Sequence, residues 1–129
     1  MYNISYSNIR VYIMNNNNNN YDHILQQCMK INPIIKMIQH HLEILKNNNY
    51  LLSQELKNII QLLDQLQPWH NGIEKELYAT RYRDTLTDAI NNLHSLLLKI
   101  SHIQLNDVSI KALTAIAELN QKIMEILKE

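Results

Sequence analysis

The sequence predicts an all-α protein: an antiparallel bundle of four main amphipathic helices, preceded by a short N-terminal helix. Three observations support this fold class. Apolar residues recur every three or four positions through most of the chain after residue 20, which is the period of an α-helix. The chain has one glycine and two prolines, too few for the tight turns of a many-stranded β fold. The breaks between periodic segments are short, which makes successive helices antiparallel neighbours.

The first expected helices lie on either side of Pro33. Asp22 can cap a short helix that ends near Ile31, and proline at a first helical position loses no hydrogen bond, so Asn32-Pro33 predicts a new start. The second helix then runs over 33–46, and the asparagines at 47–49 end it. The apolar stripes expected on these two helices are Ile24, Leu25, Cys28 and Ile31, then Ile34, Ile38, Leu42 and Leu45.

Three further helices are expected, over 50–67, 71–104 and from Asn106 or Asp107, either of which can cap it, to Leu127. The third has apolar residues at heptad-like spacing, and Pro68 ends it. The fourth is the longest, and its apolar positions fall within one arc of about 120° when residues are placed at 100° per step. The buried positions expected on these three helices are Leu52, Leu56, Ile59, Leu63, Leu66, Tyr78, Tyr82, Leu86, Ala89, Ile90, Leu93, Leu96, Leu97, Ile100, Ala112, Leu113, Ile116, Leu119, Ile123, Ile126 and Leu127.

The chain divides into an N-terminal tail, residues 1–20, and a single helical domain, residues 21–129. A tract of six asparagines ends the tail, and it predicts a disordered linker because it has nothing to bury. The alternation at 9–13 is compatible with a short strand or a docking peptide. Met14 offers an alternative start of translation, so the role of residues 1–13 stays open.

Composition excludes several classes of function. Twelve basic residues balance twelve acidic ones, so the chain lacks the basic excess typical of nucleic-acid binders, and no basic amphipathic stretch suits a membrane surface. No segment approaches the roughly twenty apolar residues of a membrane span, and no signal peptide is evident. A lone cysteine, Cys28, forms no intrachain disulfide and is expected as a small buried residue. We therefore expect a soluble cytoplasmic protein, or one delivered into a host cytosol. The Asn, Ile, Lys and Tyr bias is compatible with a virus or an intracellular microbe.

No sequence motif indicates catalysis, a cofactor or a metal. One glycine excludes a phosphate-binding glycine-rich loop, and the six histidines lack metal-ligand spacing. His94, on an expected helix, resembles the histidine of phosphotransfer bundles, but leucines at 96–98 replace the small residues that usually follow. The segment "YATRYRD" resembles an aromatic-basic patch, yet its two arginines fall on opposite sides of the helix. A signalling or catalytic bundle that uses His94 or His70 is therefore kept only as the alternative.

The expected function is protein–protein interaction without catalysis, as an adaptor, inhibitor or effector-like protein that binds itself or another protein. A homo-oligomer is expected because near-zero net charge gives little repulsion between copies. Ile73, Leu77 and Leu98 lie off the main apolar arc and are candidates for a second face. The stretch "QPWHNG" is expected as a helix corner, at which Trp69 either closes one end of the bundle or anchors a partner, beside His70.

Overall fold

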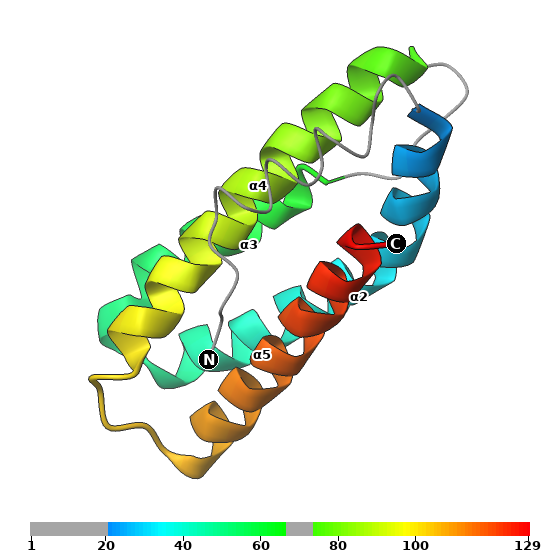
Figure 1. Ribbon diagram of the computed structural model, residues 1–129. Coiled ribbons are helices and arrows are strands. Elements are labelled where there is room, and N and C mark those ends of the chain that lie inside the picture. Colours follow the sequence, from blue (N-terminus) through cyan, green and yellow to red (C-terminus); the bar gives the residue numbers. More distant parts are fainter. Residues whose placement is uncertain (1–20, 67–73) are drawn as a thin grey trace.

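The computed structural model describes residues 21–66 and 74–129, and within these ranges it is all-α. The elements are α2 (Tyr21–Asn48), the 3₁₀ turn η1 (Tyr50–Leu52), α3 (Ser53–Asp64), α4 (Lys75–Ile100) and α5 (Asp107–Leu127). The four α-helices pack together with alternating direction, which confirms the predicted antiparallel four-helix bundle (Figure 1). None of the helices in the described part is both long and apolar enough to cross a membrane.

The short N-terminal helix is not separate, because α2 runs through Pro33 without a break. Pro33 lacks the N–H that would bond the Met29 carbonyl, but both residues are exposed, so water can bond that carbonyl instead. Ile31 and Ile35, on either side of Pro33, are almost completely buried and hold both halves of the helix against the core. Tertiary packing therefore overrides the helix break that the proline predicts.

The helix ends also differ from the predicted ones. α3 covers Ser53–Asp64 after the 3₁₀ turn instead of 50–67, and α4 begins at Lys75 instead of 71. Asp22 lies inside the first turn of α2, where its carboxylate suits the positive end of the helix dipole. Instead of continuing to 104, α4 ends at Ile100, where backbone bonds tighten into a turn and the Ser101 hydroxyl donates to the Leu98 carbonyl at 2.6 Å. Of the two caps predicted for α5, the structure uses Asn106, whose Oδ1 accepts from the Ser109 N–H at 2.8 Å, and Asp107 is the first residue of the helix.

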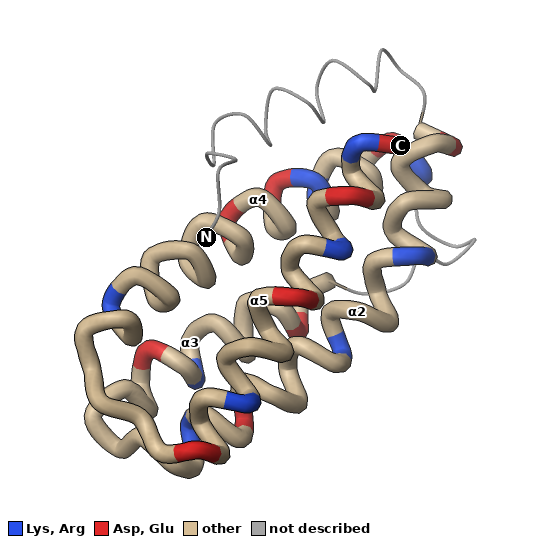
Figure 2. The backbone as a smooth tube through the Cα atoms, turned by 60° about the horizontal axis from the view of Figure 1, so that its bottom comes forward, with Lys and Arg blue, Asp and Glu red and all other residues tan. Residues whose placement is uncertain are grey.

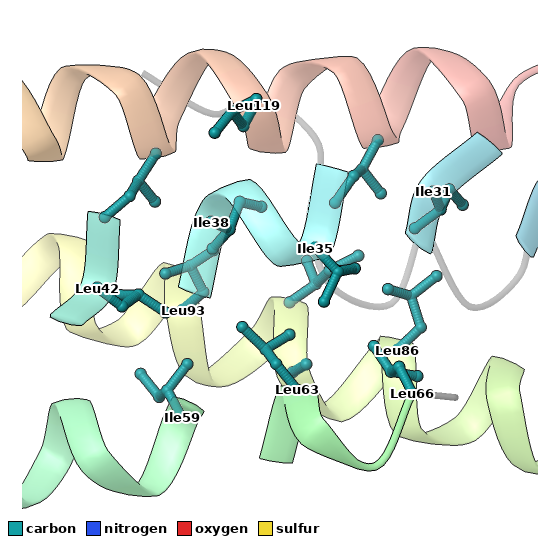
Figure 3. Close-up of a cluster of buried hydrophobic side chains, with 14 of the residues drawn as sticks. Ile31, Ile35, Ile38, Leu42, Ile59, Leu63, Leu66, Leu86, Leu93 and Leu119 are labelled. Carbon is teal, nitrogen blue, oxygen red and sulfur yellow. The ribbon is translucent and has the colours of Figure 1, made fainter. Parts of the chain in front are cut away.

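The core confirms the predicted apolar stripes. α2 lies against α5, α3 and α4, and its buried side chains meet theirs in one cluster (Figure 3). Nearly all the expected positions are buried; Ile34, Leu113 and Ile126 are half-buried, and Ile35, Ala79 and Met124 join the core unpredicted. Each fully buried leucine or isoleucine contributes roughly 1.5–3 kcal/mol relative to exposure, so this cluster supplies the main driving force for folding. Each of the four helices contributes a labelled residue to this cluster in Figure 3: Ile38 of α2, Leu63 of α3, Leu93 of α4 and Leu119 of α5.

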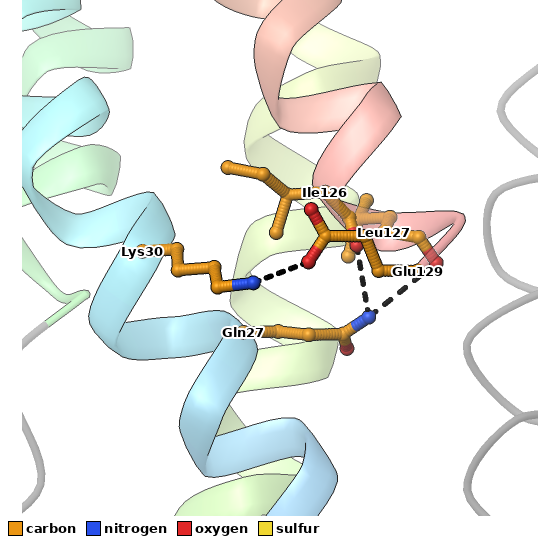
Figure 4. A network of polar contacts seen from close by, with 5 residues as sticks. All are labelled: Gln27, Lys30, Ile126, Leu127 and Glu129. Carbon is orange, nitrogen blue, oxygen red and sulfur yellow. Dashed lines mark hydrogen bonds and ion pairs between the residues drawn. The ribbon is translucent and has the colours of Figure 1, made fainter.

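Polar contacts fix how α2 is aligned with its neighbours. At its first turns, the Gln27 Nε2 donates to the Ile126 carbonyl at 3.1 Å, and Lys30 pairs with Glu129 (Figure 4). Since Gln27 is near the start of α2 and Ile126 near the end of α5, these two helices are antiparallel. The Ile126 carbonyl lies in the last turn of α5 and also accepts from the Glu129 N–H at 3.0 Å, so the Gln27 amide is an additional donor to it.

Candidate functional site

Two chain connections meet at one end of the bundle, which we call the loop end: η1 with the residues around it, and the segment 101–106. The Asn49 Nδ2 donates to the Leu45 carbonyl at 2.8 Å and to the Ser109 Oγ at 3.0 Å. The Asn106 Nδ2 donates to the Asn48 Oδ1 at 3.2 Å. These bonds join the end of α2 to the start of α5, so the two connections are held side by side.

The loop end exposes two large apolar side chains at the α2–α3 corner. Tyr50, Leu51 and Leu52 are consecutive, and a helical turn can direct only some consecutive residues to one side. Leu52 is the one that enters the core, while Tyr50 is 89% exposed and Leu51 is 92% exposed. A corner that displays two such residues to water is unusual and marks a candidate contact surface.

Exposed apolar residues concentrate at this end. Of the nine large apolar side chains that are exposed in the described residues, six come from η1, the end of α4, the segment 101–106 or the first turn of α5. They are Tyr50, Leu51, Leu98, Ile103, Val108 and Ile110. The other three lie along the outside of α2 (Met29 and Met37) or in the first turn of α4 (Leu77).

Charges of both signs surround these apolar residues. The Lys46 Nζ lies 3.0 Å from the Glu43 Oε2, and the Lys99 Nζ lies 3.4 Å from the Glu55 Oε2. Asp107 and the lysines at 57 and 111 complete the charged residues in the two helical turns nearest the loop end. In Figure 2 blue and red are interspersed there over α3 and α5, so neither sign dominates.

The candidate residues from the sequence have different outcomes. Trp69, His70 and Ile73 lie outside the described residues, so the predicted corner at 67–73 stays a prediction. Leu77 and Leu98 are both exposed on α4, as expected, but 21 positions separate them. At 1.5 Å per residue they lie about 30 Å apart along the helix, too far to form one small face.

A groove of about 400 Å³ runs between α3 and α4. Its lining is mostly amide and apolar, with Ile59 and Leu96 buried in its floor and the Glu55–Lys99 pair at its edge. Ser95 is its one hydroxyl, and neither histidine nor cysteine belongs to the lining. The groove offers hydrogen bonds but no nucleophile paired with a base, so it does not carry a reaction class.

Three buried groups with raised pKa values lie together where α2 meets α4, and all three stay protonated and unreactive near neutral pH. Burial raises the pKa of Cys28 to about 12, so the thiol is protonated near neutral pH and is a poor nucleophile. Burial raises the pKa of Tyr78 to about 12 and also raises the pKa of Tyr82. The charge that the nearby Cys28 thiolate would carry is the second cause of both shifts in pKa. The Tyr82 hydroxyl donates to the Asn32 Oδ1 at 2.8 Å, which satisfies the buried phenol.

The histidine hypotheses gain no direct support. His94 is half-buried on α4, a position compatible with the partial exposure that the phosphotransfer alternative requires, and that alternative stays a prediction. Across residues 21–66 and 74–129, no three His, Cys, Asp or Glu side chains come close enough together to hold a metal ion.

Sequence reasoning included Leu98 but missed the rest of the loop end. One signal was present: three consecutive apolar residues, Tyr50 to Leu52, follow an asparagine run, and a single amphipathic face cannot bury all three. The exposure of Val108 and Ile110 has a similar origin. They flank the buried Ser109, and neighbours on a helix point about 100° to either side.

No protein-family model, curated protein or solved structure matches this chain.

Proposed function

We propose that this chain is a non-catalytic protein-binding module whose contact surface is the loop end. The observation that carries the proposal is the concentration of six exposed large apolar side chains where the two chain connections meet. Exposed apolar groups in water are costly when they are clustered, and clusters of this kind usually mark surfaces that another protein covers.

The composition of the loop end suits a protein partner. Tyrosine supplies a large contact area with few rotatable bonds, and Tyr50 projects from the corner beside Leu51. Surrounding lysines and carboxylates can form a polar rim around an apolar centre, which is the usual anatomy of a protein interface.

Site-specific photo-crosslinking tests the proposal. A photoreactive amino acid replaces Leu51 in one variant and Met29 in the control, because both side chains are highly exposed but only Leu51 is at the loop end. We expect a covalent protein adduct from position 51 and little or none from position 29, measured by gel shift and mass spectrometry in cells that express the chain. Equal yields from the two positions, or none from either, would contradict the proposal.

A further inference from the structure

The charges around the loop end are nearly balanced. The two helical turns nearest it contain three carboxylates and four lysines, namely Glu43, Glu55, Asp107, Lys46, Lys57, Lys99 and Lys111. Two of the lysines already pair with carboxylates of the same chain. The whole chain repeats this balance, with twelve basic and twelve acidic residues.

This balance limits what can cover the surface. A strongly acidic partner, such as nucleic acid or an anionic membrane, would meet lysines and carboxylates in similar number and gain little net attraction. In a symmetric dimer, by contrast, a lysine without an ion pair to the described residues of its own chain, such as Lys57 or Lys111, can lie near a carboxylate of the other copy, such as Asp107, because a two-fold contact pairs residue i with j and j with i. A surface that is apolar at its centre and mixed at its rim is thus complementary to itself.

We propose that the partner is a second copy of this chain, bound loop end to loop end about a two-fold axis. The inference rests on the proposed function, because it assigns the partner of the same surface. Tyr50 and Leu51 of the two copies bury each other at the centre, and the lysines and carboxylates of the neighbouring helical turns face one another around them. Since neither copy carries net charge, no long-range repulsion opposes the encounter.

The shape of the pair distinguishes this arrangement from other dimers. The 28 residues of α2 make it about 42 Å long, and α2 spans the bundle from one end to the other. Two bundles joined at their loop ends form a rod of roughly 85 Å. Two bundles packed side by side stay close to the length of one.

Light scattering and small-angle X-ray scattering on the full chain test the pairing. At concentrations up to about 1 mM we expect a dimer mass and a maximum dimension about twice that of the monomer. Leu51→Asp places a charge in the apolar contact and should weaken the dimer at least about tenfold. Met29→Asp, an equally polar change on the outside of α2, should leave dimerisation unchanged. A monomer at every concentration, or a compact dimer, overturns the proposal.

Charge reversal tests the complementarity separately from the apolar contact. Lys57→Glu with Lys111→Glu leaves five carboxylates facing two lysines on each rim, so the copies should repel. We expect weaker dimerisation of this double variant at low salt and substantial recovery at high salt, where surface charges are screened. A dimerisation constant that does not change at low salt overturns the charge-pairing part of the proposal.

Spin labels locate the contact. The native Cys28 is 2% exposed and its thiol is held protonated, so labelling is directed to an introduced cysteine. Asn47→Cys places the label beside the loop end, and Gln26→Cys places it 21 residues earlier on the same helix. In the rod, the distance between labels on the two copies is about 60 Å longer for position 26 than for position 47. Similar distances for both positions contradict the end-to-end contact.

Two results separate this inference from the proposed function. If the chain is monomeric but position 51 crosslinks to a different protein, the second copy is the wrong partner and the protein-binding module stands. If position 51 crosslinks to nothing and the chain is monomeric, both fail. Co-flotation with vesicles that contain anionic lipid, lost in Leu51→Asp, would instead assign the loop end to a membrane surface and overturn the inference.

Discussion

At the scale of single residues, the most constrained groups are the Cys28 thiol and the phenols of Tyr78 and Tyr82. All three are buried where α2 meets α4, and burial makes their ionised forms unfavourable. Burial makes these groups poor nucleophiles at neutral pH, and it also makes the bundle less stable at alkaline pH.

We expect the free energy of unfolding to fall as pH rises above about 9. The unfolded thiol loses its proton near pH 9, whereas the folded thiol keeps it to about pH 12, so the unfolded state binds fewer protons over this window. The contribution of the thiol to stability is fully present below about pH 9 and is lost progressively up to about pH 12. The slope approaches about 1.4 kcal/mol per pH unit for each such group.

Urea titrations of the wild type and Cys28→Ala at several pH values between 8 and 10 measure this effect. The two tyrosines ionise in the unfolded chain only near pH 10, so Cys28→Ala should be less stable overall but flatter between pH 9 and 10. Parallel curves for the two proteins would show that the thiol is not responsible.

At the scale of elements, α2 is the helix whose sequence and structure disagree most. Asn32-Pro33 predicts a boundary, yet α2 continues from Tyr21 to Asn48. The buried residues on both sides of the proline outweigh one lost backbone bond, since each contributes roughly 1.5–3 kcal/mol. The Asn32 side chain adds a bond from Tyr82 of α4, which ties the same turn to a neighbouring helix.

Pro33→Ala should therefore stabilise the bundle. Proline inside a helix costs about 3 kcal/mol, and its restriction of the unfolded chain returns up to about 1 kcal/mol, which leaves an expected gain of about 2 kcal/mol. Thermal and urea unfolding measure the gain, with Lys36→Ala on the exposed side of the same helix as the control. A lower stability of Pro33→Ala would contradict this account of the cost of Pro33 inside α2.

At the scale of the whole molecule, stability depends on one cluster shared by four helices. Leu93 of α4 lies in this cluster, 3% exposed (Figure 3). Leu93→Ala should cost about 2–5 kcal/mol through the cavity that it leaves. Leu77→Ala, on the exposed side of the same helix, should change stability by less than about 0.5 kcal/mol. Urea unfolding of the two variants checks the comparison. Equal losses of stability would contradict the orientation of α4 that places Leu93 in the core and Leu77 on the surface.

The fold could be predicted from the sequence because apolar periodicity determines which side of each helix is buried, as in the stripe from Tyr78 to Ile100. Pro33 could not be interpreted correctly, since a local preference was overridden by packing that only the assembled bundle provides. The loop end could not be found because its residues come from four segments, and their proximity depends on bonds such as Asn49 to Ser109. Leu77 and Leu98 share a side of α4, but a helical projection discards the distance along the axis.

The contact between α2 and α5 can form only late in synthesis, because α2 is the first of the described helices and α5 is the last. Gln27 and Ile126, which bond across this contact, are 99 positions apart in the chain. The ribosome therefore releases α2 long before α5, its main packing partner, has been made. Until then the apolar side of α2 can pack only against α3 and α4. Non-local contacts of this kind slow folding and leave hydrophobic surface accessible to chaperones or to other nascent copies.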